Sequence, residues 1–385
     1  MEKPQKIRVV PRGFYSYVTS AGIKDTSLDL GVIYSEVEAQ AAAVFTQNKV
    51  CGNPVKVAQR HIRQGKIQAL IVNSKNSNVA TGREGYEAAL QLCQKVGEEL
   101  SINPQRVFPA STGVIGRRFP IEKIVTAISG LKEKLVTPPD FVSFAKAIMT
   151  TDTYPKFGER SLGKAHLVGV AKGSGMIAPN MATMLAFFFT DAQLSSNQLR
   201  KILKETVKKT FNCLSIDSDT STSDTVLVLA NGLGGPVSED EFRKNFLSLA
   251  EELTMHLARD GEGATKLFLV DVLEAKNDQE AHKIGLSIIN SPLVKTAIYK
   301  GDPNWGRIFM AIGKTPGVRV VEEKIQLFWG PEKIASENLT ALHKYLVENE
   351  VVHLEVRLGL GQGKARVYGC DLTEEYVRIN AYYTT

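Results

Sequence analysis

Strand-like and helix-like segments alternate along most of this 385-residue chain, and this order constrains the fold more than any other feature of the sequence. Residues 68–73 form a short apolar run typical of a buried strand, and residues 84–100 then place their apolar side chains on one helical face. The run 184–189 is again strand-like, and an amphipathic helix follows Ser196. This order predicts an α+β or α/β architecture in which helices cover mixed sheets.

The same alternation continues in the second half of the chain. Residues 226–230 predict a buried strand, and the glycine-rich residues 231–236 predict a turn. Ser238 and Glu241 form a capping box in front of a helix, after which residues 267–272 predict another strand. The alternating pattern of residues 353–381, which contains three closely spaced glycines, predicts a hairpin and a final strand.

Composition excludes several classes of protein. Hydrophobic residues make up 43% of the chain and charged residues 23%, which is typical of a globular protein and not of a disordered or collagen-like one. The net charge of +6 is dispersed along the sequence, so we expect no nucleic-acid partner. The most apolar short run is far below the roughly 20 residues that span a bilayer, and the first residues carry no apolar leader. We therefore expect a cytoplasmic protein with no membrane partner.

Metal sites and disulfides are not indicated by the sequence. Four cysteines, at positions 51, 93, 213 and 370, lack metal-ligand spacing and are too few for a disulfide framework, so we expect them to be buried apolar residues. The six histidines show no paired ligand spacing. Residues 217–224 are rich in aspartate like a calcium loop, but Thr222 stands where the sharp turn needs glycine. We therefore expect a polar loop there, and no metal.

The most unusual stretch is 172–185, Lys-Gly-Ser-Gly-Met-Ile-Ala-Pro-Asn-Met-Ala-Thr-Met-Leu. Its two glycines and its proline favour a kinked approach to the strand-like run, and Thr183 lies at the start of that run. It is not a phosphate-binding loop, because Lys172 precedes the glycines and no Gly-Lys-Ser/Thr follows them. The residues alone leave open an ordinary tight loop and a site where the Thr183 hydroxyl meets a backbone carbonyl.

Residues 172–183, with Thr190-Asp191-Ala192 after them, closely resemble the self-cleavage segment of the ornithine acetyltransferase (glutamate N-acetyltransferase) family of arginine biosynthesis. Further segments agree with the family in order along the chain: 13–14, 21–24, 111–116, 149–153, 260–266, 302–307 and 379–381. The resemblance covers essentially the whole chain. One departure is Lys75, where the family pattern has glycine. This difference affects only the expected geometry of the turn that contains Lys75.

The resemblance implies a fold and a processing event. The fold is an α+β, layered α/β/β/α, N-terminal-nucleophile-like fold of the ornithine acetyltransferase (DmpA/ArgJ-like) type. The chain is expected to cut itself between Ala182 and Thr183, leaving an alpha chain of residues 1–182 and a beta chain of residues 183–385 that begins with the nucleophile Thr183. The two chains are expected to stay associated, in an α2β2 heterotetramer.

The implied chemistry needs no histidine. The Thr183 hydroxyl attacks, and the α-amino group that cleavage exposes, with an ordinary pKa of roughly 7.7–8.0, accepts its proton. Thr112 and Gly113 are implied as the oxyanion hole, which stabilises the negative charge of the tetrahedral intermediate.

The implied reaction transfers acetyl from N2-acetyl-L-ornithine to L-glutamate through an acetyl-Thr183 ester and releases ornithine. The substrate-binding residues implied by the resemblance are Thr151, Lys172, Thr183, Glu262, Asn380 and Thr385, and Thr150 competes with Thr151 for its role. Lys172 supplies a cation for a carboxylate, and Glu262 supplies an anion for an ammonium group. No cofactor is required, and acetyl-coenzyme A is a candidate co-substrate for making N-acetylglutamate. The alternative is a self-processing aminopeptidase or amidase that uses water as the acceptor.

Overall fold

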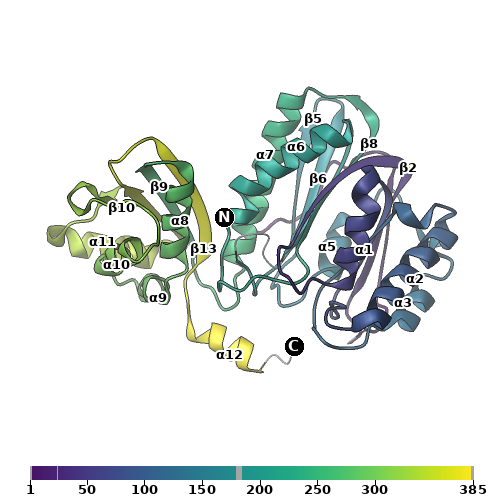
Figure 1. Ribbon diagram of the computed structural model, residues 1–385, viewed down its shortest axis with the longest axis horizontal. Helices are drawn as coiled ribbons and strands as arrows, with labels where there is room; N and C mark the ends of the chain where they lie inside the picture. The colour runs from purple at the N-terminus through teal and green to yellow at the C-terminus, as the bar shows by residue number, and fades with distance from the viewer. Residues whose placement is uncertain (1, 24, 179–183, 383–385) are drawn as a thin grey trace.

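A computed structural model describes residues 2–23, 25–178 and 184–382, and Figure 1 shows its arrangement in two lobes. The strands of these residues are β1 (Phe14–Thr19), β2 (Leu30–Phe45), β3 (Lys66–Asn73), β4 (Val107–Ser111), β5 (Lys156–Leu162), β6 (Ala165–Lys172), β7 (Leu185–Gln193), β8 (Thr225–Pro236), β9 (Leu267–Ala275), β10 (Gln326–Trp329), β11 (Glu332–Lys333), β12 (Val351–Arg357) and β13 (Gly363–Cys370). The α-helices are α1 (Asn53–His61), α2 (Gly82–Leu100), α3 (Ile121–Ala127), α4 (Leu131–Lys134), α5 (Phe141–Ala147), α6 (Ser196–Lys209), α7 (Glu239–Arg259), α8 (Asp278–Ile289), α9 (Pro292–Lys300), α10 (Gly306–Gly313), α11 (Leu339–Glu348) and α12 (Glu374–Tyr382).

Each lobe is organised around its own set of paired strands. In the larger lobe the order is β4-β3-β2-β8-β7-β6-β5, and β1 pairs with β2. In the smaller lobe the order is β11-β10-β12-β9-β13. Helix α12 leaves the smaller lobe after β13 and lies at the lower edge of the view, between the two lobes (Figure 1).

The long strand β2 lets the sheet of the larger lobe fold over on itself. Its first part pairs with β1 and β3, its last part pairs with β8, and the register with β3 shifts between Tyr34 and Ala39. The two halves of the sheet therefore face each other. Phe14 of β1 and Phe189 of β7 are not on neighbouring strands, yet their ring centroids lie 5.7 Å apart. The interior between the two half-sheets is a continuous apolar core.

Helices cover both outer faces of this folded sheet. On one side, Leu92 and Val96 of α2 pack with Ile71 of β3. On the other side, the ring centroids of Phe188 of β7 and Phe246 of α7 lie 4.6 Å apart, and α6 packs on the same face. The resulting order is helix, sheet, sheet, helix, so the predicted layered α/β/β/α fold is confirmed.

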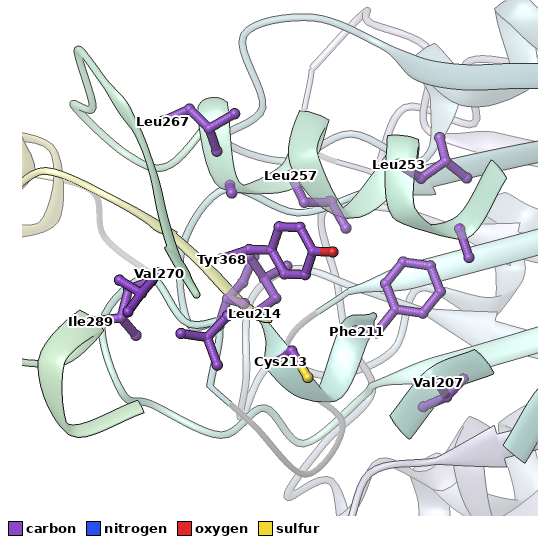
Figure 2. Close-up of a cluster of buried hydrophobic side chains, with 14 of the residues drawn as sticks. Val207, Phe211, Cys213, Leu214, Leu253, Leu257, Leu267, Val270, Ile289 and Tyr368 are labelled. Carbon is purple, nitrogen blue, oxygen red and sulfur yellow. The ribbon is translucent and has the colours of Figure 1, made fainter. Parts of the chain in front are cut away.

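An apolar cluster joins the two lobes (Figure 2). Leu253 and Leu257 belong to α7 of the larger lobe, and Leu267 of β9 and Tyr368 of β13 belong to the smaller lobe. All four side chains are buried. Burial of one large apolar side chain stabilises a folded structure by roughly 1.5–3 kcal/mol. This cluster therefore stabilises the packing of the two lobes against each other.

Most of the predicted elements are confirmed. The strands predicted at 68–73, 184–189, 226–230 and 267–272 fall on β3, β7, β8 and β9, and the helix predicted at 84–100 is α2. The Ser238 hydroxyl accepts a hydrogen bond from the Glu241 N–H (3.2 Å) and caps α7, which is the Ser238 half of the predicted capping box. Helix α6 is capped by Ser195, one residue before the serine named from the sequence.

Two sequence predictions are wrong. Residues 231–236 are not a turn, because β8 runs through them, and positive φ angles at Gly232 and Gly235 allow the strand to continue alongside the end of β7. The C-terminal hairpin is also wrong, because β12 and β13 pair with opposite sides of β9 and not with each other. The final strand is instead helix α12, whose first turn carries Glu374 and Glu375, a placement that stabilises a helix N-terminus.

Candidate active site

Six of the residues implied from the sequence line one pocket. The pocket lies where the turn after β4, the loop before β5, the end of β6, the turn after α7, and α12 meet. The six residues are Thr112, Gly113, Thr151, Lys172, Glu262 and Asn380. Because they come from segments distant in the sequence, the fold itself brings them together.

The turn that carries Thr112 and Gly113 is held tightly against the neighbouring loop. The Thr112 N–H donates to the Asn73 carbonyl (3.0 Å). Gly113 has a φ of +124°, and a Cβ at this position would lie 2.4 Å from the carbonyl carbon of Lys75. Only glycine fits this close approach without moving the backbone. Thr112 and Gly113 therefore face the pocket from a rigid turn.

Lys75, the departure from the family pattern, has a φ of 73°. This is the left-handed conformation that glycine adopts without steric cost and other residues rarely adopt. The turn nevertheless forms, since the Val114 N–H still donates to the Lys75 carbonyl (3.3 Å). The substitution thus adds local backbone strain at Lys75 and keeps the geometry next to Gly113.

Lys172, at the end of β6, is a buried cation whose side chain is bonded to hydroxyl groups. Only 2% of the residue is exposed. Its Nζ donates to Thr150 Oγ1 (2.8 Å) and to Thr112 Oγ1 (3.3 Å). Burial lowers the pKa of Lys172, and the charge of Asp152 opposes this effect. Both Thr150 and Thr151 line the pocket, and Thr150 is the one that accepts the hydrogen bond from Lys172.

Glu262, in the turn after α7, places an anion on the same pocket. Its Oε2 accepts a hydrogen bond from Asn380 Nδ2 on α12 (2.7 Å). A Cβ at Gly175 would lie 2.3 Å from this carboxylate, so the absence of a side chain at Gly175 allows Glu262 to approach the 173–176 turn. The pocket thus combines a buried ammonium group with a partly buried carboxylate.

Sequence reasoning missed a second wall of the pocket, formed by Ser221, Thr222 and Ser223. They belong to the loop predicted only to be polar. The carboxylate of Asp217 in this loop accepts hydrogen bonds from the N–H groups of Met176 (2.5 Å) and Ile177 (2.9 Å). The signal in the sequence was a dense run of serine, threonine and aspartate directly before a buried strand.

The sequence model of the ArgJ family matches residues 16–385. This chain belongs to the ArgJ family. It is 48% identical over 383 residues to "Arginine biosynthesis bifunctional protein ArgJ 2" of Nostoc sp., covering 97% of this chain and 98% of that protein. It is 45% identical to the protein of the same name from Clostridium acetobutylicum, covering 98% of each. The crystal structure of arginine biosynthesis bifunctional protein argJ from Bacillus halodurans matches with 41% identity and a TM-score of 0.48, covering 50% of this chain and 96% of that one.

Some of the site residues implied by the resemblance to the ArgJ family lie outside the described residues: Ala182 and Thr183, with the bond between them, and Thr385. On the far side of that bond, the Met184 N–H donates to Asp224 Oδ1 (2.9 Å). Asp224 is fully buried, and burial raises its pKa well above the usual range for an aspartate. The loop 217–224 therefore holds the described residues on both sides of the predicted cleavage segment.

Within residues 2–23, 25–178 and 184–382, no three histidine, cysteine, aspartate or glutamate side chains are grouped as metal ligands. In the same ranges no helix has the length and apolar character needed to cross a bilayer. Cys93, Cys213 and Cys370 are buried free thiols, as expected, and Cys51 is partly exposed.

Proposed function

We propose that this ArgJ-family chain is an acetyltransferase that moves an acetyl group from N2-acetyl-L-ornithine to L-glutamate in arginine biosynthesis. The names of its relatives support this assignment: "Arginine biosynthesis bifunctional protein ArgJ" at up to 48% identity, and "Glutamate N-acetyltransferase Oat2" of Streptomyces clavuligerus at 41%. "Bifunctional" in these names supports acetyl-coenzyme A as a second acetyl donor. No cofactor is required by the proposed exchange.

The observation that carries the proposal is the pairing of Lys172 and Glu262 on one pocket. Acetylornithine has a carboxylate at one end and an ammonium group at the other. The Lys172 ammonium binds the carboxylate, which replaces part of the hydration that burial removes. The Glu262 carboxylate, with Asn380 beside it, binds the ammonium group.

The reaction begins with self-cleavage. The Thr183 hydroxyl oxygen attacks the Ala182 carbonyl carbon, the carbon–nitrogen bond between the two residues breaks, and the proton moves to the leaving nitrogen. Water then hydrolyses the resulting ester and leaves a free α-amino group on Thr183. In the transfer reaction this amine takes the Thr183 hydroxyl proton while the hydroxyl oxygen attacks the acetyl carbonyl carbon. The amide carbon–nitrogen bond of acetylornithine then breaks, the proton passes from the Thr183 ammonium to the departing nitrogen, and ornithine leaves. The amine of glutamate then attacks the acetyl ester and restores the hydroxyl.

Thr112 and Gly113 act as the oxyanion hole in this mechanism. The Thr112 N–H is already bonded to Asn73, so the hydroxyl is the donor that Thr112 offers. That hydroxyl accepts a hydrogen bond from Lys172 Nζ, which leaves its proton free to donate to an oxyanion. Loss of one such donor typically lowers the rate by about 10²–10³-fold.

The proposed products are an alpha chain of residues 1–182 and a beta chain of residues 183–385, associated as α2β2 in the cytoplasm. The cut falls between β6 and β7, which pair with each other in one sheet. This pairing supports chains that stay together after cleavage.

The test uses intact mass and one assay. The purified protein is expected to give two masses that correspond to a cut before Thr183, and to transfer acetyl from acetylornithine to glutamate. Thr183→Ala is expected to abolish both activities, and Thr183→Ser is expected to keep cleavage because a hydroxyl remains. Hydrolysis at a rate that does not depend on glutamate contradicts the proposal and favours an amidase. Cleavage or turnover by Thr183→Ala places the nucleophile elsewhere.

A further inference from the structure

Three charged side chains form a buried network that is hydrogen-bonded to a residue of the pocket. Lys156 Nζ donates to Asp152 Oδ1 (2.7 Å) and to Asp260 Oδ2 (2.6 Å). The Lys156 and Asp152 side chains have no exposed surface, and the Asp260 side chain is 3% exposed. Removing charged groups from water is costly, and a buried ion pair often contributes little net stability compared with apolar residues. Stability alone therefore does not account for this network.

Asp152 connects two of the segments that line the pocket. Its carboxylate accepts hydrogen bonds from the N–H groups of Thr150 (3.0 Å) and Gly173 (2.7 Å). Thr150 is itself bonded to Lys172, and Gly173 directly follows Lys172 in the chain. One carboxylate thus fixes the backbone on both sides of the Lys172–Thr150 hydrogen bond.

Asp260 connects the third segment. Its carboxylate accepts a hydrogen bond from the Thr153 N–H (3.0 Å), and its backbone carbonyl accepts one from Ser174 Oγ (2.5 Å). The Glu262 N–H, two residues further along the chain, donates to the Ser174 carbonyl (3.0 Å). The network therefore links the segments that carry Thr150, Lys172 and Glu262.

We propose that Asp152, Lys156 and Asp260 are positioning residues that fix the distance between the Lys172 ammonium and the Glu262 carboxylate, so that the two charges match the two ends of the substrate. The proposal deepens the proposed function and rests on it, because it takes acetylornithine to be the ligand of Lys172 and Glu262. The three residues do not themselves line the pocket.

The charges around Lys172 have opposing effects on its protonation. Burial lowers its pKa, Asp152 raises it, Lys156 lowers it, and Asp224 and Glu262 raise it. Conversely, burial alone would raise the pKa of Asp152, but the charges of Lys156 and Lys172 hold it below its usual range. Loss of Asp152 and loss of Lys156 must therefore change the protonation of Lys172 in opposite directions.

The test measures kcat/KM for acetylornithine as a function of pH, because this parameter reports the pKa values of essential groups in the free enzyme. In the wild type, kcat/KM is expected to fall at high pH as Lys172 loses its proton, and this fall is the basic limb of the profile. Asp152→Asn is expected to move the basic limb to lower pH, and Lys156→Met is expected to move it to higher pH, each by on the order of one unit. In both variants KM is expected to rise more than kcat falls. The double variant is expected to return toward the wild-type limb, and Lys156→Arg, which keeps the charge, is expected to retain it.

Matched controls remove a charge of the same sign from side chains that do not line the pocket. Glu87→Gln and Lys201→Met replace side chains that are 59% and 64% exposed, and the limb is expected to stay in place. Shifts in the same direction for Asp152→Asn and Lys156→Met, or no shift in either, overturn the proposal. If one of these variants does not fold, the comparison of Lys156→Met with Lys156→Arg, or of Asp152→Asn with wild type, still tests the sign. A wild-type protein without exchange activity refutes the proposed function instead.

Discussion

Replacing Asp217 with asparagine is expected to change how the stability of the protein depends on pH. Burial raises the pKa of Asp217 to about 6 from an ordinary value of 3.8, although the N–H groups of Asp219, Met176 and Ile177 donate to its carboxylate and oppose the rise. Two effects of opposite sign therefore compete at one carboxyl group, and the pH dependence reports which is larger.

The sign and size follow from the two pKa values. Because the folded-state pKa is above that of the unfolded chain, the Asp217 carboxyl contributes stability that is fully present below about pH 4 and is lost as the pH rises through about 6. A shift of about 2 units corresponds to about 3 kcal/mol in the free energy of unfolding. Asparagine does not titrate, so the free energy of unfolding of Asp217→Asn, minus that of the parent protein, is expected to increase by about 2.5 kcal/mol between pH 4 and pH 7, since the remainder of the change falls below pH 4.

Urea unfolding followed by far-ultraviolet circular dichroism at several pH values measures this difference. Both proteins carry Thr183→Ala, so that under the proposed function each remains a single polypeptide. A difference for Asp217→Asn that stays constant with pH would mean that the backbone N–H groups balance burial, and one that decreases toward pH 7 would mean that they outweigh it. Either result would refute the reasoning.

Three further predictions concern backbone positions at the pocket. Gly113→Ala would place a Cβ 2.4 Å from the Lys75 carbonyl carbon and is expected to lower kcat for acetyl transfer by about 10²–10³-fold; an unchanged kcat would contradict the role of this turn as an oxyanion hole. Lys75→Gly removes a non-glycine residue from the left-handed conformation and is expected to raise the free energy of unfolding, measured with urea, by up to about 1 kcal/mol. The reason is that the relief of backbone strain exceeds the conformational entropy that glycine adds to the unfolded chain. A lower free energy of unfolding would show that the Lys75 conformation is not strained. Gly175→Ala would place a Cβ 2.3 Å from the Glu262 carboxylate and is expected to raise KM for acetylornithine roughly tenfold, an effect of about 1.4 kcal/mol. Self-cleavage, followed by gel electrophoresis, is expected to continue. Equal damage to cleavage and to substrate binding would mean that the substitution disturbs the whole turn.

Most individual helices and strands followed from local sequence patterns, whereas the order of the layers followed from the family resemblance. Periodicity located α2 and α7, because each helix buries one regular face, and a short continuous apolar run located β3, which is buried on both faces. It failed where local composition and tertiary pairing conflict: the glycines of residues 231–236 indicate a turn, but pairing with β7 keeps them in a strand. Strand pairing of β12 and β13 with β9 is likewise a long-range choice that the segment itself does not encode.

The site followed from the sequence only in part. The family resemblance named six residues that line the pocket, yet nothing in their spacing predicts that Thr112 and Asn380 lie on one pocket. The Lys156–Asp260 bond joins residues 104 positions apart, and each residue alone resembles an ordinary surface charge. Burial turns these charges into a network, and burial is a property of the complete fold.

The strand order β2-β8-β7-β6 has a practical consequence if the N-terminal portion, residues 1–182, and the C-terminal portion, residues 183–385, are produced from two separate genes. Strands β7 and β8 of the C-terminal portion are inserted between β2 and β6 of the N-terminal portion, so the sheet of the larger lobe is complete in neither polypeptide. Expressed alone, each piece would present open apolar edges that invite aggregation. Co-synthesis in one cell is therefore expected to succeed where mixing of separately purified halves fails, and a single precursor that is cut only after folding avoids this assembly problem altogether.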